Sequence, residues 1–226
     1  VWCGWQYDAP PTPGLIGMRV PEAMGPDGRL TGRILHQFQA NEPTQLFLLA
    51  DRIHTPHAPV DPDDSTASMT VRDHPNSPAE PIERTEFSLV RVEDGWEQAG
   101  ATHVYMPSGF DPGRIYQLVY ETVGSAVAGL GFAAVRDIVS FLKYAPSDAG
   151  NPCAEDIEYV LAYGSSQSGR FLRQLLHLGL NEDEQERKAL DGVIAHVAGG
   201  MRGEFNLRFG QPSKDVCFII PEMFPF

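Results

Sequence analysis

A short segment rich in serine and glycine has the clearest potential for chemistry in this sequence. Residues 164–169 read GSSQSG, with an apolar run before them and an amphipathic run after them. When a strand turns sharply into a helix, a serine in the turn lies exposed above the sheet edge and can act as a nucleophile. The N-terminus of the following helix favours a developing negative charge. The segment therefore predicts acyl transfer through a serine.

Ser166 is the better of two candidate nucleophiles in this segment. The chain reverses within a few residues, so the side chains two positions before and after the nucleophile must be small. Ser166 has Gly164 and Ser168 at those positions, whereas Ser168 has Ser166 and the large Arg170. An ordinary strand-to-helix turn capped by serine is the alternative interpretation.

A serine nucleophile of this kind needs donors for the oxyanion of the tetrahedral intermediate. We expect the backbone N–H of Gln167 to be one donor, because it follows the nucleophile directly. The second donor should come from residues 121–128, after the strand expected at 115–122.

Sequence patterns change near residue 112. Residues 1–111 are rich in Pro and Asp and contain short β-prone runs, at 45–50, 68–72, 86–92 and 102–106. Residues 112–226 alternate between strand and helix patterns: strands at 115–122, 157–163 and 193–198, and helices at 132–144, 171–180 and 181–190, the last capped by Asn181. Such alternation implies a parallel sheet. We predict an α/β fold with a partial, α/β-hydrolase-like parallel sheet in 112–226, preceded by a β-rich region in 1–111.

Several segments together resemble one protein family. They are GLGFAAVRD at 129–137, GSSQSGRFLR at 164–173, NEDE at 181–184, DGVIAHVAG at 191–199 and GEFN at 203–206. These resemble the α/β-hydrolase domain-containing proteins of bacterial and fungal genomes. The serine segment is also similar to the corresponding turns of acetyl-xylan-type and glucuronoyl esterases. The resemblance implies a hydrolase with its nucleophile at Ser166 and leaves the substrate open.

Other members of a catalytic triad are hard to find after Ser166. In α/β-hydrolases an acid and then a histidine follow the serine, yet only His177 and His196 do so here. A helix would carry His177 roughly 16 Å away. His196 lies within an apolar strand pattern, which favours a structural histidine in the strand interior. We therefore expect the acid and base beyond Phe226, and a fragment that is weak or inactive alone.

Composition and spacing disfavour other classes of function. A net charge of −13 argues against nucleic acid as a partner, and no run reaches the roughly 18 apolar residues that a membrane span needs. The three cysteines and the histidines at 54 and 57 show no metal-site pattern, so we expect neither a metal nor a cofactor. Residues 129–134, GLGFAA, match a dinucleotide fingerprint, but six residues separate them from the preceding strand. The leading prediction is a carboxylic ester hydrolase acting on a small-molecule ester. A non-catalytic binding module and an NAD(P)-dependent oxidoreductase are the alternatives.

Overall fold

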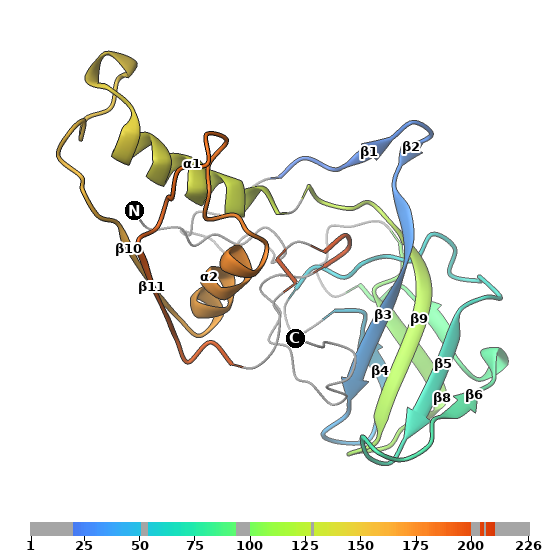
Figure 1. Cartoon of the computed structure of the whole chain (residues 1–226). Helices are drawn as coiled ribbons and strands as arrows, with labels where there is room; N and C mark the ends of the chain where they lie inside the picture. The colour runs from blue at the N-terminus through green and yellow to red at the C-terminus, as the bar shows by residue number, and fades with distance from the viewer. Residues whose placement is uncertain are drawn as a thin grey trace. The chain divides into compact units, whose positions relative to one another are not determined.

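A computed structural model describes residues 20–50, 54–93, 100–127, 129–199, 204–205 and 207–210. The described residues fall into two compact units, a β-rich unit at 20–127 and an α/β unit at 129–210. Figure 1 shows the elements of both along the chain. Each unit has its own apolar core and is described by itself.

Two antiparallel sheets form most of the β-rich unit. The first has the order β3 (Thr31–Gln39), β9 (Ile115–Val123), β5 (Ser68–Arg72) and β6 (Glu80–Ile82). The second has the order β4 (Thr44–Leu48), β8 (His103–Phe110) and β7 (Ser88–Val90). A small hairpin, β1 (Met24–Gly25) with β2 (Gly28–Arg29), and a 3-10 turn, η1 (Arg84–Glu86), complete the unit. The β-prone runs predicted near 45, 68, 86 and 102 are confirmed, and β1, β2, β3 and β6 are additional strands.

Aromatic stacking fills the core of the β-rich unit. Phe38 stacks on Phe47 with ring centroids 4.3 Å apart and on Tyr116 at 5.5 Å, and Phe110 meets Phe38 edge-on at 5.3 Å. Offset and edge-on pairs of this kind are favourable beyond the area they bury. These rings come from β3, β4, β8 and β9, and side chains of β5 and β7 complete the core.

The strand predicted at 115–122 is present as β9, but the prediction that it belongs to the parallel sheet is wrong. β9 pairs antiparallel with both β3 and β5. Its buried Tyr116, Leu118 and Tyr120 alternate with less buried residues such as Gln117 and Glu121. This period of two is typical of antiparallel sheets with one face on a core, whereas buried parallel strands are apolar on both faces.

The α/β unit contains one parallel strand pair. Its elements are α1 (Leu130–Tyr144), the 3-10 turn η2 (Ser147–Ala149), β10 (Leu161–Ser165), α2 (Gln167–His177) and β11 (Gly192–His196). β10 and β11 pair in parallel from Leu161 opposite Gly192 to Ser165 opposite His196. Parallel pairing is thus observed for two of the three strands predicted to take part. The core joins Phe132 of α1 to Leu172 and Leu175 of α2.

The predicted helix at 181–190 is wrong. Within this segment Asp183 accepts the backbone N–H groups of Gln185 at 2.9 Å and Arg187 at 3.0 Å. The side-chain amide of Asn181 bonds both the N–H and the C=O of Leu190, which closes a loop. Side-chain bonds to nearby backbone compete with helix formation, and here they win.

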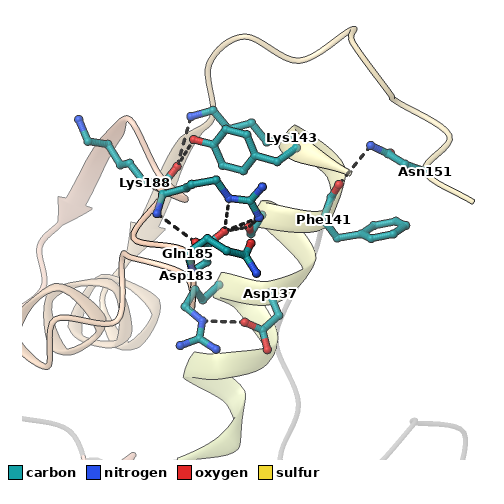
Figure 2. A network of polar contacts seen from close by, with 11 residues as sticks. Asp137, Phe141, Lys143, Asn151, Asp183, Gln185 and Lys188 are labelled. Atoms are coloured by element: carbon teal, nitrogen blue, oxygen red, sulfur yellow. Dashed lines mark hydrogen bonds and ion pairs between the residues drawn. The ribbon is translucent and has the colours of Figure 1, made fainter. Parts of the chain in front are cut away.

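Polar contacts tie this loop to α1 (Figure 2). Ser140 donates to the Asp183 carboxylate, which also accepts Nε of Arg187 at 2.8 Å. Further along α1, the Tyr144 hydroxyl donates to the Lys188 carbonyl at 2.7 Å. The hydrogen bonds from Arg187 and Ser140 lower the pKa of Asp183 well below its usual range. A charged Asp183 therefore holds the loop and the helix together.

A buried amide closes the C-terminal end of α1. The last carbonyls of a helix have no partner within it. Nδ2 of Asn151 donates to the carbonyls of Phe141 at 3.1 Å, Leu142 at 3.0 Å and Ala145 at 2.7 Å. Its Oδ1 accepts the Cys153 N–H at 2.9 Å. One side chain thus ends the helix and begins the next turn.

Asp183→Asn should remove a contribution to stability that is present at neutral pH and is lost in acid. The folded-state pKa of Asp183 is below its unfolded value of about 3.9, so the stabilisation is complete above that pH and is lost as the pH falls toward the folded pKa. We expect the variant to melt several degrees below the parent at pH 7, with the gap narrowing below about pH 4.

Circular dichroism melts from pH 7 to pH 2 measure this gap. Asp137→Asn is the matched control, because Asp137 is exposed and pairs with its neighbour Arg136. A gap for Asp183→Asn that stays constant with pH would contradict the role of its charge.

Candidate functional site

Ser166 lies between the end of β10 and the start of α2, so the predicted strand–serine–helix order is confirmed. Its side chain is exposed. Its backbone has φ 55° and ψ −115°, a combination that is costly for a residue with a Cβ. The strand before it begins later than predicted, at Leu161. Strain of this kind tends to occur at functional sites.

A second strained residue lies at the same edge of the strand pair. Val197 follows the last residue of β11 with φ 42°, which is rare for a β-branched residue. The N–H of Ser166 donates to the carbonyl of His196 at 3.0 Å. The carboxyl ends of both strands therefore turn sharply side by side, with a hydrogen bond between them.

Two glycines allow α2 to pack closely on this strand pair. A Cβ at Gly164 would lie 2.5 Å from the carbonyl oxygen of Ser168. A Cβ at Gly169 would lie 2.9 Å from the carbonyl oxygens of both Gly164 and His196. The expected need for a small residue before Ser166 is met at Gly164. After it, the tight position is Gly169 and not the exposed Ser168.

Gly169 is a site residue that the sequence reasoning missed. A glycine in the first turn of a helix costs stability relative to alanine, so its presence there signals a close approach of another backbone. The sequence analysis considered only the positions two residues before and after Ser166, whereas the need for a glycine depends on where α2 touches the strands.

Gln167, the predicted oxyanion donor, is the first residue of α2. The carbonyl of Ser166 accepts the N–H of Arg170 at 2.9 Å, so Ser166 is the residue that caps the helix. The N–H of Gln167 thus lies at the positive end of the helix dipole. The second donor, expected from 121–128, stays a prediction. Residues 121–127 belong to the β-rich unit, and 128 lies outside the described residues.

The two histidines after Ser166 occupy different places. His177 is the last residue of α2 and is exposed, as predicted from the helix. His196 is also exposed, so the interpretation of it as an interior histidine is wrong. The strand ends at His196 because Val197 takes a positive φ. The His196 ring stacks on that of Tyr163, with centroids 6.1 Å apart.

The glycine-rich segment at 129–134 has a structural explanation. Gly129 caps α1 with φ 89°, a conformation that suits glycine. The preceding strand β9 lies in an antiparallel sheet, so the strand–turn–helix unit of a dinucleotide site is not formed here.

Among the described residues, no group of three or more His, Cys, Asp or Glu side chains could hold a metal ion. No helix of the described chain is long and apolar enough to cross a membrane.

The strain at Ser166 predicts an inverted order of stability between two variants. Ser166→Ala keeps a Cβ in the unfavourable conformation, whereas Ser166→Gly removes it. We expect the glycine variant to be more stable than the alanine variant by about 1 kcal/mol. Urea denaturation of both measures the difference. The pair Ser147→Gly and Ser147→Ala, at an exposed position, is the control. An alanine variant more stable than glycine at position 166 would show that the turn is unstrained.

Comparison with known proteins adds a family to this geometry. No curated protein and no solved structure gives a significant match. One family model, described as an alpha/beta hydrolase domain, matches residues 74–218. The match covers more than half of the chain and includes Ser166, both glycines and the parallel strand pair. The chain therefore belongs to the alpha/beta hydrolase domain family.

Proposed function

We propose that this protein is a serine hydrolase that cleaves carboxylic esters of small molecules, with Ser166 as its nucleophile. The observation that carries the proposal is the exposed, strained Ser166 between a parallel strand and a helix, in a chain of the hydrolase family. A serine kept at φ 55° exposes its hydroxyl at the strand edge. This is the arrangement expected of a nucleophile in an α/β-hydrolase.

In the proposed reaction, Oγ of Ser166 attacks the acyl carbon of the ester and loses its proton to a general base. The carbonyl oxygen becomes an oxyanion, to which the Gln167 N–H donates at the start of α2. Collapse of this intermediate breaks the ester bond, and the leaving oxygen takes the proton from the base and departs as the alcohol. Water then hydrolyses the acyl-serine, which releases the carboxylic acid and regenerates Ser166.

The proposal assigns no general base to His177 or His196. His177 leaves the site along α2, and the ring of His196 packs on Tyr163, three residues before Ser166. A serine hydroxyl near neutral pH is a poor nucleophile without a base within about 3 Å. We therefore expect slow ester turnover by these 226 residues, supported mainly by the helix N-terminus.

A fluorophosphonate probe tests the nucleophile, because it forms a covalent bond with an activated serine. We expect Ser166→Ala to abolish labelling, and Ser168→Ala to leave it nearly unchanged. Turnover of p-nitrophenyl acetate should fall by about tenfold or more in Ser166→Ala and much less in Ser168→Ala.

Mass spectrometry of the labelled peptide provides the control, since it locates the modified oxygen. Both variants remove one hydroxyl from neighbouring exposed serines. Labelling that survives Ser166→Ala and disappears in Ser168→Ala would reassign the nucleophile. An unlabelled parent protein would reject ester hydrolysis by these 226 residues and favour a binding role for them.

A further inference from the structure

We infer that Asp191 is a positioning residue, which fixes the register of β10 against β11 and so the geometry of the Ser166 turn. Its importance for chemistry rests on the proposed function, but its effect on the turn does not. The argument follows from the contacts at the two ends of this strand pair.

Asp191 joins the beginnings of both strands. It directly precedes β11, and Val160 directly precedes β10. The Asp191 N–H donates to the Val160 carbonyl at 2.8 Å, and Oδ2 of Asp191 accepts the Val160 N–H at 2.9 Å. One residue thus pairs with both backbone groups of Val160 and sets which residues face each other next.

A cation from α1 holds the same carboxylate oxygen. Nζ of Lys143 lies 2.6 Å from Oδ2 of Asp191. The Lys143 side chain is only 8% exposed and that of Asp191 22%. Because the Lys143 side chain is mostly covered, loss of the carboxylate would leave its ammonium without this charge partner. The carboxylate is therefore anchored to α1 as well as to β10.

The register set at this end determines the contacts at the other. The pair runs five positions, from Leu161 opposite Gly192 to Ser165 opposite His196. Immediately beyond it, the Ser166 N–H reaches the His196 carbonyl at 3.0 Å. Strand side chains alternate with a period of two, so a slip of one residue would reverse the faces and misplace this bond.

Packing on one face of the pair does little to prevent such a slip. On that face Leu161 is 79% exposed, Tyr163 66% and Ile194 63%. Register is strongly specified where a face is buried and weakly specified where it is not. The opposite face packs on α2 and its core through Ala162, Gly164 and Val193. The contacts of Asp191 therefore add a directional constraint on the register to the one that this packed face supplies.

Amide hydrogen exchange of the 226-residue chain, followed by NMR at pH 7, tests this role. Asp191→Ala should speed exchange of the Ser166 amide about tenfold, the effect of losing one hydrogen bond to a charged group. The amide of Leu172, inside α2, should change much less. Asp191→Asn retains an acceptor for the Val160 N–H but loses the charge, so we expect an intermediate ratio.

Asp137→Ala is the matched control, because it removes an exposed aspartate of α1 that pairs with its neighbour Arg136. Equal acceleration at Ser166 and Leu172 would show a purely global effect and overturn the inference, as would no change at either. If Asp191→Ala does not fold, the ratio in Asp191→Asn decides. The fluorophosphonate rate at Ser166 should fall alongside. An unlabelled parent would reject ester hydrolysis by these 226 residues, while the exchange ratio would still test the role of Asp191.

Discussion

The α/β unit depends on the close approach of α2 to the strand pair at Gly164 and Gly169. Neither position has room for a Cβ, because backbone oxygens of Ser168, Gly164 and His196 occupy that space. A helix this close to its own preceding strand can be joined to it only by a very short turn. Ser166 is that turn, and it takes a φ of 55° because the chain must reverse its direction within one residue. The placement of the hydroxyl is thus a consequence of backbone packing.

Charge performs a different task in the same unit. The loop at 181–191 connects α2 to β11 and is held by side chains, since Asp183 and Asn181 bond the nearby backbone. Ser140 and Lys143 then attach it to α1. Apolar packing brings the helices together through Phe132 and Leu175 and places Ala162 and Val193 of the strands on the same core. Directional polar contacts at the strand ends add a constraint on the strand register.

Much of this fold could be predicted from local patterns. The period of β5, the helical stripe of α1 and the GSSQSG turn each depend on neighbouring residues, and the sequence displays them directly. The partners of β9 could not be predicted, because its alternation of Tyr116, Leu118 and Tyr120 with polar residues indicates a strand without naming its neighbours. The prediction of a helix at 181–190 was wrong because the Asp183 carboxylate can stabilise either a helix or a loop. Its hydrogen bonds with Arg187 and Ser140 stabilise the loop. His196 was predicted to lie inside a strand, but the strand ends at His196 because Val197 takes a positive φ.

The buried Asn151, which bonds two carbonyls of α1 and that of Ala145 directly after it, also affects the chemical lifetime of the protein. Asparagine usually deamidates when the next backbone nitrogen attacks the side-chain carbonyl carbon and forms a cyclic imide. Here the next residue is Pro152, whose nitrogen carries no hydrogen and cannot complete that route. Conversion to aspartate would point a carboxylate at the carbonyls of Phe141, Leu142 and Ala145, with every donor lost. The residue whose ageing would damage this helix end most is therefore followed by the one amino acid that blocks the usual ageing reaction.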